Sequence, residues 1–295
     1  MSAIRKGSKP PRVGDGPLFS RFLIGIVLVL GALLILAPLV IIGVEAFAKG
    51  WQVYASTIAH PDTQHAIGLT VLAALIAVPV NTVFGIAAAW AIAKFDFRGK
   101  RLLLVVIEIP FSVSPIVAGV AYLFVYGLQG IFGPAFDEYG IKILFAIPGI
   151  ILASMFVTAP FVARELIPLM QAQGRDLEEA ATSLGASGWR TFFSVTLPNI
   201  RWALLYGVVL CNARVMGEFG AVSVVSGNIR GQTNTLPLHI ELLYHDYQTT
   251  GAFAAASILA LIAVFTIIAK VALERQGAGR GRSRPAAPQP SDAAQ

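Results

Sequence analysis

The chain has 295 residues, of which 56% are hydrophobic and only 13% are charged. Soluble proteins average roughly 25% charged residues, so this composition excludes an ordinary soluble domain and indicates a polytopic membrane protein. The formal net charge is +6, but the basic residues gather in alternate loops, a pattern that reports membrane topology rather than nucleic-acid binding. The single cysteine, Cys211, excludes an intrachain disulfide.

We predict an all-α fold with six transmembrane helices, because six apolar segments are long enough to cross roughly 30 Å of hydrocarbon. The first segment is longer than the roughly 7 to 15 residues of a secretory signal core, so we expect it to be retained. The basic arm 1–21 and the tail 273–295 are expected to be disordered. The predicted spans cover residues 22–44, 66–93, 102–128, 143–163, 202–225 and 252–272.

The lysine and arginine residues predict the orientation of these spans. The leader, the second loop, the loop 164–201 and the tail hold four or five basic residues each, whereas the loops on the opposite side hold one each: Lys49, Lys142 and Arg230. Loops rich in lysine and arginine remain in the cytoplasm. Both termini and the loop 164–201 are therefore predicted to be cytoplasmic.

The loop 164–201 is too long for a simple connection between packed helices, which usually takes about 2 to 8 residues. Its sequence predicts two short helices joined by a tight corner. Asp176 is placed to cap the first helix, with Glu179 three positions later as in a capping box. Gly185 is placed to end that helix in a left-handed conformation.

The amino-acid sequence of this loop resembles a known signature. Glu179, Ala180 and Ala181, then Gly185, Val195, Leu197 and Pro198, follow the spacing E-A-A-x3-G-x9-I-x-L-P with valine in place of isoleucine. This resembles the EAA loop of permease subunits in bacterial ABC importers. The resemblance implies that the loop docks into a cytoplasmic ATPase subunit. No G-x-x-x-x-G-K-[ST] loop occurs in this chain, so we expect no cofactor and no enzyme activity here, with ATP and Mg bound by the partner ATPase.

Two prolines interrupt the third predicted span. Pro110 and Pro115 free backbone carbonyls, which need partners in protein or in a wet cavity because they cannot face lipid. Ser112 and Ser114 lie in the same interruption. Their hydroxyls could donate hydrogen bonds to an anion in transit, or they could satisfy the broken helix itself.

Two opposite charges lie within the fifth span. Arg214 and Glu218 are four residues apart, so they can pair on one helix face. Charges at membrane depth are costly and normally face protein or water. The pair could be structural, or Arg214 could give a cavity a positive potential for an anion with Glu218 restraining it. Gly217 and Gly220 would let the helix bend as a gate requires.

A longer stretch of the sequence makes the resemblance to a particular group of permeases more specific. PNIRWALLYGVVLCNARVMGEFGAVSVVSGNIRGQT, with LPLHIELL after it, resembles permeases of bacterial sulfate/thiosulfate ABC importers, in particular their W-type subunit. The resemblance implies half of a heterodimeric pore in the bacterial inner membrane, driven by ATP. It implies three partners: a second permease subunit of the T type, two copies of a cytoplasmic ATP-binding subunit, and a periplasmic sulfate/thiosulfate-binding protein. Another oxyanion such as molybdate stays open as the cargo.

Two other classes of function fit the sequence less well. A secondary anion transporter would need its own coupling-ion site and would not explain the loop around Glu179. An intramembrane hydrolase would need a nucleophile and base at membrane depth, and metal ligation has no supporting cluster. The external segment 227–251 predicts an amphipathic stretch followed by an aromatic and polar patch, either an interfacial helix or a docking site for an external partner.

Overall fold

The computed structural model describes residues 17–281, and within that range the chain is helical without β-strands, as predicted. Two helical stretches contain π-helical turns, η1 and η2. The elements in chain order are α1 (Pro17–Gly31), η1 (Ala32–Leu36), α2 (Ala37–Ala46), α3 (Trp51–Ala59), α4 (Pro61–Lys94), α5 (Lys100–Ser112), α6 (Pro115–Tyr126), α7 (Gly133–Glu138), α8 (Ile147–Thr158), α9 (Pro160–Ala172), α10 (Asp176–Ser183), α11 (Gly188–Thr191), η2 (Phe192–Thr196), α12 (Leu197–Met216), α13 (Gly220–Val225), α14 (Leu236–His245) and α15 (Thr249–Gly281).

Five helices in the described range are long and apolar enough to cross a membrane, or six if a bent pair counts as one span. They cover Phe19–Ala46, Pro61–Lys94, Ile147–Ala172, Gly188–Met216 and Thr249–Ala269. The bent pair is α5 with α6, whose axes differ by 109°. The count is consistent with the six predicted spans.

Several boundaries differ from the sequence prediction. Residues 17–21 and 273–281, which were predicted to be disordered, belong to the helices α1 and α15, and the rest of the predicted arm and tail lies outside the described residues. The third span breaks once, between Ser112 and Pro115, while Pro110 is accommodated inside α5. The fifth span ends at Met216 and resumes as α13 at Gly220, because Gly217 and the two residues after it leave the helix. The fourth span continues to Ala172, so the connection to the next long helix covers only residues 173–187.

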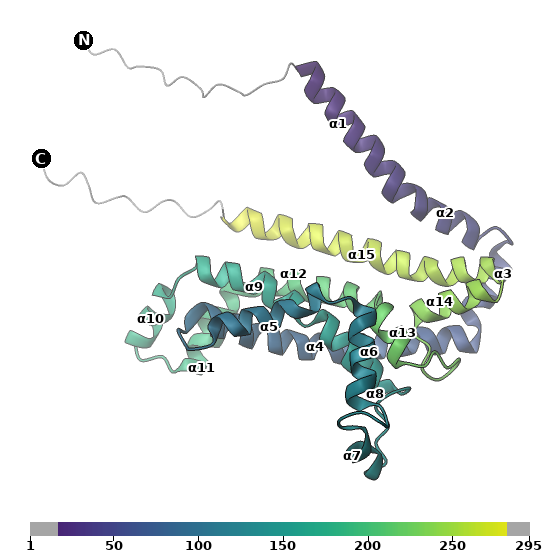
Figure 1. Ribbon diagram of the computed structural model, residues 1–295. Helices are drawn as coiled ribbons and strands as arrows, with labels where there is room; N and C mark the ends of the chain where they lie inside the picture. The colour runs from purple at the N-terminus through teal and green to yellow at the C-terminus, as the bar shows by residue number, and fades with distance from the viewer. Residues whose placement is uncertain (1–16, 282–295) are drawn as a thin grey trace, which may run out of the picture.

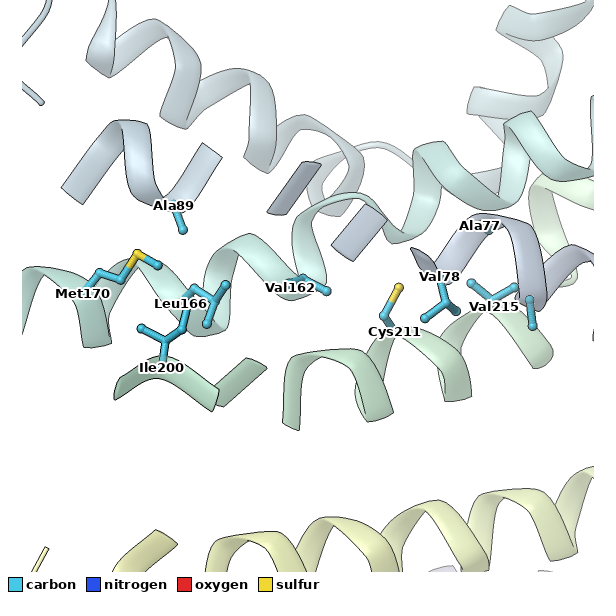
Figure 2. Packing of buried hydrophobic residues seen from close by; sticks show 10 residues of the cluster. Ala77, Val78, Ala89, Val162, Leu166, Met170, Ile200, Cys211 and Val215 are labelled. Atoms are coloured by element: carbon cyan, nitrogen blue, oxygen red, sulfur yellow. The ribbon is translucent and has the colours of Figure 1, made fainter. Parts of the chain in front are cut away.

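The core lies where α4, α9 and α12 pack together. Figure 2 shows small and medium side chains from these three helices meeting, with Val162 and Leu166 of α9 between the other two. Small residues let membrane helices approach closely, and close packing rather than hydrophobic burial stabilises such contacts. The buried residues are Ala74, Ala77, Val78, Ala89, Val162, Leu166, Met170, Ile200, Cys211 and Val215.

Gly85 marks the closest approach of α4 to α9. A Cβ atom there would lie 2.6 Å from Val162 Cβ and 2.9 Å from the Ala163 nitrogen. We expect Gly85→Ala to lower the melting temperature of the purified complex, because overpacking costs about 1–3 kcal/mol and exceeds the roughly 1 kcal/mol that alanine gains over glycine in a helix. Gly68 lies in the same helix with nothing within 4 Å of a Cβ. Gly68→Ala should therefore leave the melting temperature unchanged or raise it, and an equal loss in both variants would contradict this account.

The helices place the polar corner at one end of the molecule. In Figure 1, α10 and α11 lie at the same end as the C-terminal end of α15, whereas α3, α13 and α14 lie at the opposite end. The helix α1 diverges from the others, and only its continuation α2 runs beside α15. The apolar window of the first span has none of its residues buried within this chain. Lipid or another subunit must therefore cover it.

Candidate functional site

The corner between α10 and α11 is closed by a left-handed glycine, as predicted. Gly185 has φ +86°, the Gly185 amide donates to Thr182 O at 2.9 Å, and the Ala186 amide donates to Ala181 O at 3.0 Å. This pair of bonds is the Schellman arrangement, which satisfies the last carbonyls of a helix. Ser187 then caps α11 by accepting a hydrogen bond from the Arg190 amide at 3.4 Å.

The predicted cap at Asp176 is wrong. The helix begins with Asp176 as its first helical residue, Arg175 occupies the capping position, and no side chain caps this end. A carboxylate in the first turn still interacts favourably with the helix dipole. The acidic start of α10 is thus an electrostatic feature rather than a capping box.

An exposed apolar surface covers the corner. Leu184 is 89% exposed and Trp189 is 75% exposed, and Leu177 and Phe193 are also exposed. The rings of Trp189 and Phe193 stack with centroids 6.0 Å apart. Large exposed apolar side chains gathered on a polar segment indicate a site of interaction with another protein or a membrane. We call these four residues the coupling surface.

The predicted signature residues lie around this surface in sequence, and none of them is one of its four residues. Glu179 and Ala180 are exposed on α10, whereas Ala181 is half-buried. Val195 lies in η2, and Leu197 and Pro198 begin α12, so they belong to the long helix Gly188–Met216. The signature therefore spans the corner and the start of a membrane helix.

A buried lysine joins α4 to this corner. Lys94 Nζ lies 2.9 Å from Glu178 Oε1, and it also donates a short hydrogen bond to the Gly174 carbonyl. Its side chain is 7% exposed and that of Glu178 is 19% exposed. Thr196 Oγ1 of η2 donates to the same Glu178 oxygen at 3.1 Å. One carboxylate thus contacts two other parts of the chain.

A second, exposed contact lies beside it. Asp96 Oδ2 lies 3.2 Å from Arg175 Nη2, and Asp96 Oδ1 lies 3.3 Å from Lys100 Nζ. The hydrogen bond and charge of Lys100, followed by those of Arg175, lower the pKa of Asp96 below its ordinary value. The carboxylate therefore stays ionised at neutral pH, although an exposed pair of this kind contributes little stability.

The two helix breaks lie against each other. A Cβ atom on Gly220 would lie 2.9 Å from Pro115 Cβ, and one on Gly119 would lie 2.8 Å from the Ala221 carbonyl oxygen. The break between α5 and α6 thus contacts the break between α12 and α13. Non-helical backbone at membrane depth is tolerated only where protein buries it or where it lines a wet cavity.

Arg214 and Glu218 lie at the second break. Arg214 Nη2 is 2.9 Å from Glu218 Oε2, an ion-pair distance without the alignment of a hydrogen bond. Glu218 Oε1 accepts a hydrogen bond from the Ala221 amide at 3.0 Å. The Glu218 side chain is 1% exposed, whereas that of Arg214 is 36% exposed. Glu218 therefore stabilises the break between α12 and α13 from a buried position, whereas the charge of Arg214 is accessible to solvent.

Ser112 and Ser114 remain accessible at the first break. Both are exposed, and neither hydroxyl makes a hydrogen bond to another residue in the described part of the chain. Ser112 lines a cavity of about 180 Å³ with Glu108. In this structure the two hydroxyls do not satisfy the broken helix, and their role in an anion pathway stays a prediction.

The segment 227–251, which the sequence predicts to be external, folds back against the bundle. Leu238, His239 and Leu243 of α14 are buried, and His239 Nε2 lies 2.9 Å from Thr63 Oγ1 of α4. Burial lowers the pKa of His239 below its ordinary value, so the ring is neutral at pH 7. Tyr244 and Tyr247 remain exposed. The apolar face of α14 is thus packed within the chain, and the aromatic end of the segment is exposed.

The fold, the helix breaks and the exposed corner define a membrane-spanning transport component. Residues 81–276 match the family described as "Binding-protein-dependent transport system inner membrane component", and the chain belongs to this family. It is therefore a multi-pass permease subunit of the inner membrane.

Comparison with individual relatives shows which permeases within this family the chain is similar to. The chain is 56% identical over 253 residues to the "Sulfate transport system permease protein CysW" of Escherichia coli K12, covering 86% of this chain and 87% of the relative. It is 50% identical over 260 residues to the protein of the same name from Synechococcus elongatus, covering 88% and 91%. The "Sulfate transport system permease protein CysT" of Escherichia coli K12 is 34% identical over 250 residues, covering 83% and 90%. The predicted resemblance to W-type sulfate permeases is confirmed.

Solved structures support the fold. A chain of a bacterial alginate ABC transporter, in complex with a periplasmic protein bound to an alginate pentasaccharide, superposes with a TM-score of 0.70 at 16% identity. The superposition covers 88% of this chain and 94% of that chain. At this identity the likeness establishes the permease fold alone.

Sequence reasoning missed several residues at the corner. Trp189 and Phe193 stand four residues apart in a polar loop, a helical spacing that would have revealed them as one exposed face. In the sequence, Lys94 is simply one of the basic residues between the second and third predicted spans. Its pairing with Glu178 joins residues distant in sequence, so no local signal could show it.

Proposed function

We propose that this chain forms half of the pore of an ATP-driven importer of sulfate and thiosulfate. The observation that carries the proposal is the coupling surface, since large exposed apolar side chains on a charged corner need a protein partner. The names of the relatives support sulfate as the cargo. The other half of the pore is a T-type permease subunit, as the relation to a second sulfate permease suggests.

The coupling surface docks on a cytoplasmic ATPase in this proposal. Two copies of that subunit bind ATP and Mg, one copy contacting each half of the pore, and a periplasmic sulfate/thiosulfate-binding protein delivers the anion to the opposite face. Both termini and the corner between α10 and α11 lie in the cytoplasm. The alternation of basic residues along the chain supports this orientation.

Anion import requires an energy source of this kind. Moving a dianion into a cell with an inside-negative potential of 100 mV costs roughly 4.6 kcal/mol before any concentration gradient. Arg214, Gly217, Glu218, Gly220, Ser112 and Ser114 form the candidate pathway and gate, because the two helix breaks that hold them are in contact. Closure of the ATPase pair displaces α10, and the movement reaches these breaks through the packed helices α4, α9 and α12.

Competition for uptake tests the cargo. Cells lacking their own sulfate importers, and carrying this chain with its partner subunits, should take up labelled sulfate, and an excess of thiosulfate should suppress that uptake more than tenfold. Two substrates of equal affinity compete in proportion to their concentrations, so more than about a tenfold excess of thiosulfate is enough for this effect. Stronger suppression by molybdate than by thiosulfate would identify a permease for another oxyanion instead.

A further inference from the structure

We propose that Lys94 and Glu178 form a clamp that transmits the movement of α10 to the membrane helices α4 and α12, so that ATP hydrolysis remains coupled to anion movement. This inference rests on the proposed docking of an ATPase at the coupling surface. Lys94 and Glu178 are positioning residues in this scheme, since they touch neither nucleotide nor anion.

The clamp connects three separate parts of the chain. Lys94 is the last residue of α4, and its Nζ atom contacts Glu178 of α10 at 2.9 Å and the carbonyl of Gly174 just before that helix. Glu178 in turn accepts a hydrogen bond from Thr196 Oγ1 in η2, which leads into α12. A displacement of α10 therefore pulls on α4 and on α12 through one carboxylate.

Burial makes these contacts rigid. The lysine side chain is almost fully enclosed at 7% exposure, so water cannot easily replace its partners. The neighbouring aromatic rings of Trp90 on α4 and Phe192 on η2 lie 5.2 Å apart and close the same junction. The exposed pair of Asp96 and Arg175 lacks this enclosure. The buried pair of Lys94 and Glu178 is thus the contact that transmits movement between α10 and α4.

The clamp acts on helices that reach the proposed gate. The same α4 and α12 pack on α9 through the core, and α12 ends at Met216, directly before the break that holds Glu218. The other end of α4 is fixed by a contact with α14, in which Thr63 Oγ1 lies 2.9 Å from His239 Nε2. A rigid connection at the cytoplasmic end therefore converts a displacement of α10 into a change at the breaks.

The test measures sulfate imported per ATP hydrolysed in proteoliposomes that contain the complete complex. Lys94→Met keeps the volume of the side chain but removes its charge, and Glu178→Gln removes the partner charge. Both variants should retain ATPase binding and hydrolysis while the ratio falls at least about fivefold, the lower range of coupling between sites. The double variant should fall no further than Lys94→Met alone, because residues that act as a pair are non-additive. Arg98→Met removes an exposed charge from the same loop and should leave the ratio unchanged.

A merely structural role predicts a different pattern. Clamp variants would then yield less assembled complex, but each assembled complex would import the wild-type amount of sulfate per ATP, and this result would overturn the proposal. If Lys94→Met fails to assemble, Glu178→Gln decides, since its side chain is less buried. Failure of the proposed function gives a separate result. In that case, altering the coupling surface itself leaves ATPase binding and sulfate uptake unchanged.

Discussion

Replacing Leu184 by aspartate should reduce sulfate uptake to less than about a tenth of the wild-type rate while the chain still inserts in the membrane. Leu184 is 89% exposed and makes no contribution to the core, so the substitution leaves the fold intact. A charge placed at the centre of an apolar interface costs about 2 kcal/mol or more, as at other interface hot spots, and each 1.4 kcal/mol is tenfold. The loss should appear in co-purification of the ATPase with this chain as well as in uptake.

Leu184→Met is the matched control for that prediction, because methionine keeps the apolar character and approximate volume of leucine. It should retain most of the uptake and of the bound ATPase. Normal ATPase binding and uptake in Leu184→Asp would show that the coupling surface contacts something other than the ATPase.

Arg214→Gln should lower uptake more than tenfold in complexes that assemble normally. The Arg214 side chain is 36% exposed at the break between α12 and α13, whereas its partner Glu218 is enclosed. A unit charge 4 Å from an anion contributes roughly 1–4 kcal/mol at effective dielectric constants of 80 to 20, and glutamine removes that attraction. The variant also leaves Glu218 with the Ala221 amide as its remaining contact.

Arg214→Lys separates the two roles of this residue. Lysine keeps the charge near the pathway but loses the planar geometry of the guanidinium group. If Arg214 attracts the anion, uptake should recover to within about threefold of wild type, less than 1 kcal/mol. Equal losses of assembled complex in both variants, with normal uptake per complex, would indicate that the ion pair only fixes the bend.

Local sequence features predicted the parts of the site that depend on local geometry. Gly185 adopts the left-handed conformation that its position after an alanine-rich helix requires. The break before Pro115 follows from proline chemistry, because the residue before a proline disfavours the helical conformation. The apolar spans followed from length and hydropathy, and the structure contains them.

Features that depend on tertiary contacts could not be predicted from the sequence. Asp176 has the residue type of a cap, yet it is the first residue of the helix, and Arg175 in the capping position already has a backbone conformation in the helical region. The pairing of Lys94 with Glu178 depends on how α9 returns the chain to the end of α4. The contact of Gly220 with Pro115 likewise requires two breaks to meet in space. Such contacts are set by packing and leave no periodic signal.

Sulfate accumulation in proteoliposomes tests the central claim most directly. This chain would be reconstituted with its T-type partner, the ATPase and the binding protein, with ATP on the side that exposes α10 and the binding protein with labelled sulfate on the other side. We predict accumulation of sulfate on the ATP side, lost without ATP hydrolysis, without the binding protein or with Leu184→Asp. Accumulation of sulfate that continues without ATP and follows an ion gradient instead would contradict the account.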